Sequence, residues 1–203
     1  NTKKNDMKKG CLIAVVAAVV IAGAIFMWVK GAYNGFVEKD EAVKTAWSQV
    51  ENVYQRRADL IPNLVETVKG YAAHEKETLE GVVAARAKAT QITVDPENMT
   101  PEKLKEYQAA QGELGAALGK LLAITENYPD LKANENFLQL QAQLEGTENR
   151  ITVERGKFND VAKEYNVSIR TFPANILAGM FGFQQRSYFE AAAGAEQAPQ
   201  VKF

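Results

Sequence analysis

Residues 11–29 read CLIAVVAAVVIAGAIFMWV, an apolar stretch without a charged residue or a proline. An α-helix of these 19 residues spans roughly 28 Å, close to the hydrocarbon thickness of a bilayer. A segment inside lipid must satisfy its backbone hydrogen bonds internally, which favours a helix. We therefore expect residues 11–29 to form one transmembrane helix, with the lipid bilayer as its partner.

A cleavable signal peptide is the alternative for this segment. Lys8 and Lys9 could form its charged region, and Ala22-Gly23-Ala24 could form its small-residue cleavage site. The apolar run continues past this site to Val29, which is too long for a signal-peptide core. A membrane anchor is therefore the preferred interpretation.

The lysines beside the span indicate its orientation. Those that precede it are Lys3, Lys4, Lys8 and Lys9, whereas residues 30–44 carry charges of both signs. Lysine and arginine near the ends of a span favour the cytoplasmic side. We expect basic residues 1–10 in the cytoplasm and the remainder in the periplasm, as in a single-pass protein of the bacterial inner (cytoplasmic) membrane.

Small residues recur every four positions along this helix: Gly10, Ala14, Ala18 and Ala22. A stripe of small side chains lets membrane helices pack closely. Alanine is also common in membrane helices without this role, so self-association through the stripe and simple apolar filling remain equal alternatives.

Apolar residues after residue 42 follow a seven-residue spacing, which is typical of helices that pack along a common seam. One series is Trp47, Tyr54, Ile61 and Val68, and another is Phe137, Leu144, Ile151, Phe158, Tyr165 and Phe172. The spacing predicts a first helix from Ala42 through Arg86, kinked at Pro62. It also predicts a second helix from Pro101 to about Glu126, and a third that ends at Pro173.

The predicted fold is therefore all-α. One N-terminal transmembrane helix precedes an elongated antiparallel helical bundle over residues 30–189, with heptad packing. Residues 190–203 are rich in alanine, glutamine and glycine, and we expect a flexible tail there.

Charged residues within the apolar seams point to buried ion pairs. Arg57 falls on the seam of the first helix, and Glu148, Glu154 and Arg155 lie on or beside that of the third. A buried charge is tolerated mainly when it is paired. We expect Arg57 to pair with Glu148, or with Glu154, in a layer that fixes helix register. The alternative is that the arginines extend to solvent.

The sequence offers no complete catalytic or metal site. His74-Glu75 lacks the second histidine four residues on that a zinc protease helix requires, because Thr78 stands there. Residues 115–120 (GAALGK) have the wrong spacing for a phosphate loop. We predict no enzyme activity and no cofactor. A net charge of −1 also argues against nucleic acid as a partner.

Residues 174–189 (ANILAGMFGFQQRSYF) form an apolar, aromatic segment. In a bundle of three long, straight helices, this segment lies at the end far from the membrane, unless a bend at Pro62 or Gly70 folds the bundle back. It then folds onto the bundle tip or contacts another subunit. We prefer the subunit contact, because a tip of three helices offers little area to cover it. The proposed contact residues are Ile176, Leu177, Met180, Phe181, Phe183 and Phe189.

Several of these blocks resemble the LemA family in order and spacing. The most specific is RRADLIPNLV at residues 56–65. The motif residues include Arg56, Arg57, Asp59, Pro62, Asn63, His74, Glu75, Asn159, Tyr165 and Asn166. Phe158 stands where the family pattern leads us to expect tyrosine.

The resemblance implies an N-terminal membrane helix followed by an antiparallel helical bundle, and no established catalytic activity. A LemA-like domain occurs in a protein of magnetosome membranes, which suggests a role in membrane organisation. We therefore expect a non-enzymatic scaffold that forms homo-oligomers and organises or shapes the bacterial cell envelope. The alternative is a monomeric adaptor for an envelope protein partner, such as a membrane protease.

Overall fold

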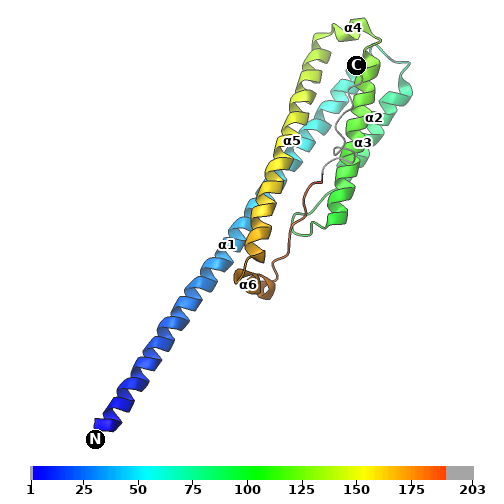
Figure 1. Cartoon of the computed structure of the whole chain (residues 1–203). Helices are drawn as coiled ribbons and strands as arrows, with labels where there is room; N and C mark the ends of the chain where they lie inside the picture. Colours follow the sequence, from blue (N-terminus) through cyan, green and yellow to red (C-terminus); the bar gives the residue numbers. More distant parts are fainter. Residues whose placement is uncertain (1, 191–203) are drawn as a thin grey trace, which may run out of the picture. The chain divides into compact units, whose positions relative to one another are not determined.

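A computed structural model describes the fold of residues 2–190 and the side-chain environments of residues 12–190. Its helices are α1 (Thr2–Lys69), α2 (Lys76–Gln91), α3 (Pro101–Thr125), α4 (Pro129–Lys132), α5 (Glu135–Arg170) and α6 (Ala174–Phe181) (Figure 1). Residues 2–190 contain no β-strand. The predicted all-α class is therefore confirmed. The tail predicted at 190–203 lies, except for Glu190, outside the described residues.

The described chain divides into two compact units. The anchor unit comprises residues 2–41 and 164–185, and the bundle unit comprises residues 42–163 and 186–190. Both α1 and α5 are continuous helices that contribute to both units. The anchor unit therefore contains α6 in addition to the apolar N-terminal part of α1.

The helices of the bundle unit alternate in direction. α2 turns back along α1, and α3 packs against α2 (Figure 1). α5 is antiparallel to α1, because their contacts run in opposite order along the two helices: Trp47 with Phe158, Arg57 with Glu148, and Tyr71 with Asn134. The bundle is thus built from α1, α2, α3 and α5.

The prediction of one helix from Ala42 through Arg86 is wrong. α1 ends at Lys69 and α2 begins at Lys76. Gly70 lies at the break. The Val68 carbonyl accepts hydrogen bonds from the backbone N–H groups of Tyr71 and Ala72, at 3.0 and 2.8 Å. The sequence therefore encodes four long helices where the heptad spacing indicated three.

Pro62 lies within α1 but does not end it. Proline has no N–H, so the carbonyl of the residue four positions earlier, Ala58, loses its usual helical donor. The Nε of Arg86 on α2 donates to this carbonyl at 2.7 Å. A side chain from the neighbouring helix thus replaces the missing backbone donor.

The heptad residues form much of the core. Those on α1 are buried from Trp47 to Val68, and those on α5 are buried from Phe137 to Tyr165. The next residue of the α5 series, Phe172, is 77% exposed. It lies just beyond the end of α5, where the seven-residue spacing no longer places a side chain on the packed face.

The anchor unit contains the predicted membrane segment. α1 has one stretch that is long and apolar enough to cross a membrane, and the protein buries none of it. Next to this stretch, Tyr33 packs edge-on against Phe181 of α6, with ring centroids 4.9 Å apart. Phe36 packs against Phe183 at 5.2 Å.

The prediction that residues 174–189 lie far from the membrane is wrong for α6 and Phe183, which pack beside Tyr33 and Phe36 of α1. That prediction assumes three long helices. The break at Gly70 adds a fourth, so α5 runs back toward the start of α1, and Glu164 lies 3.9 Å from Lys39. α6 then lies beside α1 only a few residues after the span.

Candidate functional site

Arg57 is the centre of a polar layer within the bundle. It is buried, and its Nη1 lies 2.7 Å from the Glu148 carboxylate on α5. Its Nη2 donates to the main-chain carbonyl and to Oε1 of Gln111 on α3, at 2.9 and 2.7 Å. The guanidinium also lies 5.2 Å from the ring centroid of Tyr54. One side chain from α1 therefore links α3 and α5.

The expected pair of Arg57 and Glu148 is present, whereas Glu154 and Arg155 make other contacts. Glu154 pairs instead with Lys157, on its own helix. Arg155 donates to the Glu190 carbonyl at 3.1 Å and lies 4.7 Å from the ring centroid of Phe189. Arg155 thus contacts the chain after α6, at Phe189 and Glu190. That the polar layer around Arg57 fixes the register of the helices stays a prediction.

A groove of about 620 Å³ opens beside this layer, between α1, α3 and α5. Arg57, Glu148 and Arg155 line it, together with Gly112 and Gly115 of α3. A Cβ at Gly112 would meet nothing within 4 Å, and one at Gly115 would meet only Arg57, at 3.8 Å. These glycines widen the groove.

A segment after α6, residues 186–190, crosses the bundle and is called the C-terminal strap below. Phe189 is buried and stacks on Trp47, with ring centroids 5.9 Å apart. The Asn159 amide forms two hydrogen bonds with the Phe189 backbone: its Nδ2 donates to the carbonyl at 3.0 Å, and its Oδ1 accepts from the N–H at 2.8 Å. Phe189 is therefore a core residue and is not available for the subunit contact predicted for it.

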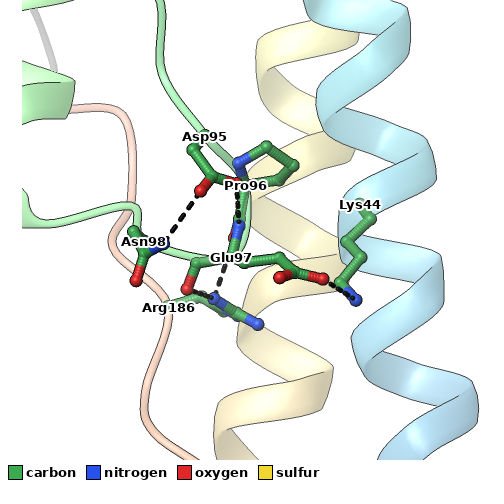
Figure 2. Close-up of polar contacts among 6 residues, drawn as sticks. All are labelled: Lys44, Asp95, Pro96, Glu97, Asn98 and Arg186. Carbon is green, nitrogen blue, oxygen red and sulfur yellow. Dashed lines mark hydrogen bonds and ion pairs between the residues drawn. The ribbon is translucent and has the colours of Figure 1, made fainter.

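The strap also contacts the loop between α2 and α3, as Figure 2 shows. Arg186 Nη1 donates to the carbonyls of Pro96 and Glu97, at 2.8 and 3.1 Å. Asp95 accepts from the Glu97 N–H and from Asn98, and these hydrogen bonds hold the pKa of its carboxyl below the ordinary value. The Glu97 carboxylate in turn lies 3.2 Å from Lys44 of α1.

Most of the other motif residues make structural contacts. Arg56 donates to Gln143 on α5 at 3.1 Å, and Asp59 accepts from Gln55 at 2.7 Å. Glu75 accepts from the Tyr128 hydroxyl at 3.0 Å. Asn63 and His74 are exposed, whereas Tyr165 and Asn166 are buried in the anchor unit.

The remaining predicted contact residues divide between α6 and the segment after it. Leu177 is buried, and Phe183 packs on Tyr33 and Phe36, so neither offers a free surface. Ile176, Met180 and Phe181 are 56%, 74% and 48% exposed. Of the expected membrane stripe, Ala14, Ala18 and Ala22 are exposed, and Gly10 lies outside the residues whose side chains are described.

Among residues 12–190, whose side chains the structure describes, no group of His, Cys, Asp and Glu side chains is arranged to hold a metal ion. The bundle unit contains the Arg57–Glu148 ion pair, the docked strap and the open groove beside them. Sequence reasoning missed Arg86, although the proline four residues after Ala58 was a signal that a carbonyl needed a donor.

The LemA family profile matches residues 46–203, which is most of the chain. The chain belongs to the LemA family. Among named relatives, it is 30% identical over 194 residues to the magnetosome protein MamQ of Magnetospirillum gryphiswaldense, with 87% of this chain and 70% of that protein covered. It is 28% identical to the magnetosome protein MamQ 2 of Paramagnetospirillum magneticum, with 88% and 71% covered.

A member that carries the LemA name is also similar. Protein LemA of Metamycoplasma hominis is 25% identical over 174 residues, with 86% of this chain and 76% of that protein covered. The family assignment agrees with the expectation from RRADLIPNLV, which lies within the matched range. The described part of this LemA-family chain is thus helical and contains one candidate membrane span.

Proposed function

We propose that this protein is a non-enzymatic, membrane-anchored scaffold that self-assembles and organises or shapes the bacterial cell envelope. The continuity of α1 carries this proposal, because one helix from Thr2 to Lys69 joins the apolar segment to the bundle without a linker. A direct connection between a membrane anchor and a protein domain suits a scaffold. The magnetosome names of two relatives support a role in organisation.

We place the protein in the inner (cytoplasmic) membrane, with residues 1–10 in the cytoplasm and the bundle in the periplasm. The lysine cluster before the span supports this orientation. Lys30 and Lys39 follow the span, so lysines lie on both sides of it. The proposed orientation rests on the closer spacing of the lysines within residues 1–10.

Self-assembly is proposed to use the small-residue stripe of α1. Ala14, Ala18 and Ala22 are exposed on one face, where a second α1 could approach closely in lipid. The contact of the 174–189 segment with another subunit is no longer the preferred route, because Phe189 and Leu177 are buried within the protein.

The mass of the full chain in a mild detergent tests assembly. A discrete oligomer is expected, and Ala18→Leu should reduce its mass because the larger side chain separates the helices. The control is Gly23→Leu, which makes a similar change about half a turn away from Ala14 and Ala18. Equal loss of assembly in both variants would show that the stripe is not the contact.

The alternative is a monomeric adaptor that binds an envelope protein, such as a membrane protease. The open groove beside Arg57 favours it, since its walls combine charged side chains with the glycines of α3. A monomeric mass of the native chain, with another protein retained through purification, would support the adaptor and contradict the scaffold.

A further inference from the structure

One face of α6 exposes large apolar side chains. Together with the residue before Pro173, they form what we call the α6 patch: Phe172, Ile176 and Met180, with exposures of 77%, 56% and 74%. Residues 171–185 contain no charged residue. An exposed apolar surface without charge is unfavourable in water and marks a contact with another apolar phase.

The opposite face of α6 fixes the patch against α1. Leu177 and Ala178 are buried, and Phe181 contacts Tyr33 with ring centroids 4.9 Å apart. Phe183 continues this packing onto Phe36 at 5.2 Å. The α6 patch therefore has a defined position along α1.

This position coincides with the expected membrane surface. Tyr33 follows Val29, the last residue of the apolar span, by four residues, a rise of roughly 6 Å along a helix. The headgroup layer of one leaflet is about 5–7 Å thick. A span that ends at Val29 thus places Tyr33, and the α6 ring that touches it, within the headgroup layer.

The neighbouring side chains are those of an interfacial segment. Trp28 and Tyr33 are exposed aromatic residues at the end of the span, a typical location for these rings in membrane proteins. Lys30, next to the end of the span, and Arg170, two residues before Phe172, are exposed cations that can approach lipid phosphates.

We propose that the α6 patch inserts into the boundary between headgroups and acyl chains, in the leaflet from which α1 emerges. Its partner is the lipid bilayer itself. A single span leaves a protein free to rotate about the span axis, whereas a second contact on one side of α1 selects which face of the anchor unit meets the membrane. This inference does not depend on the scaffold function or on self-assembly.

The test measures the depth of the α6 patch in lipid. Cys11→Ala first removes the native thiol, and Met180→Cys then introduces one labelling site for an environment-sensitive fluorophore. The full chain is placed in phosphatidylcholine vesicles that contain lipids with a nitroxide quencher close to the headgroup. The matched control carries the label at Ala116→Cys, an exposed position on α3 of the bundle unit.

The Met180 label should lose most of its emission to the nitroxide lipids, and the Ala116 label should keep its emission. Ile176→Glu, added to the Met180→Cys chain, should restore much of the lost emission without changing helix content. Quenching that this charge leaves intact would mean proximity without insertion and would overturn the proposal. A Met180 label that resists both nitroxide lipid and aqueous iodide would overturn it in favour of a second protein copy. A label open to iodide and unquenched by lipid would also overturn it.

Discussion

The Arg86 guanidinium donates from Nε to the main-chain carbonyl of Ala58 at 2.7 Å, and so replaces the donor that Pro62 lacks. Ala58 is buried, so its carbonyl has no ready access to solvent. A contact between helices α1 and α2 therefore compensates for a proline inside α1, which explains how a 68-residue helix continues through it.

This relationship predicts an unusual dependence between two substitutions. Arg86→Ala should cost about 1–3 kcal/mol of stability, because it leaves a buried carbonyl without its donor. In a Pro62→Ala background the residue-62 N–H can donate to Ala58, so the same change should cost clearly less. Chemical denaturation of the four chains in a double-mutant cycle measures this coupling. Purely additive effects would show that Arg86 acts only through packing.

The polar layer predicts an order of effects. Arg57→Ala should cost on the order of 3 kcal/mol, because it removes a buried side chain and leaves the Gln111 Oε1 unpaired. Glu148→Ala should cost less, since the Glu148 side chain is 47% exposed and water in the groove can replace it. Lys157→Ala breaks an exposed pair and should cost below about 0.5 kcal/mol. Unfolding midpoints give the order, and an Arg57→Ala chain as stable as the native one would exclude the register lock.

The C-terminal strap should contribute strongly to stability. Phe189→Ala removes a buried ring that stacks on Trp47 and meets Phe158 at 5.5 Å, and we expect a loss of about 3–5 kcal/mol. Val153→Ala, an exposed change on α5, serves as the control and should have little effect. Thermal unfolding monitored by helix content compares the two, and a mild effect of Phe189→Ala would place the strap outside the cooperative unit.

Glu51 should make the bundle less stable as pH rises. Burial raises the pKa of its carboxyl, so the folded state holds this proton more tightly than the unfolded chain does. Stability then falls as pH rises from the unfolded pKa through the raised folded value. Glu51→Gln should therefore be more stabilising at pH 7 than at about pH 4. Melting temperatures at both pH values measure this effect, with Glu106→Gln, at an exposed position, as the control. The same pH dependence in both variants would refute it.

The orientation is tested by protease access. If the bundle is periplasmic, protease added outside spheroplasts should degrade it, because α1 carries it across the inner membrane. Detergent-opened cells show that the protease can cleave it at all. Full protection in sealed spheroplasts would reverse the orientation.

The sequence predicted the helical seams well but not where the chain reverses direction. Seven-residue spacing continues from Val68 to Val82, although the chain turns back between them. Periodicity reports which face of a helix is buried, and that face is the same whether one helix continues or two pack side by side. Gly70 was a visible weak point, but only the turn that follows it determines the direction of α2.

The candidate site shows the same division. A charge at position 57 in an apolar seam required a partner, and so Glu148 could be predicted. The contact of Phe189 could not, because composition grouped it with α6. Gly182, in the left-handed region at φ 77°, ends α6, and the chain beyond it enters the bundle. Where an apolar side chain packs depends on this tertiary path, which the local sequence does not specify.

The burial of Phe189 also constrains the order of events during biosynthesis. Trp47 meets Phe189, which is synthesised 142 residues later. The apolar span leaves the ribosome first, long before the bundle core can close around that ring. If the span is inserted as it emerges, insertion precedes completion of the core, and a bundle that is periplasmic, as proposed, crosses the membrane as an unfolded chain.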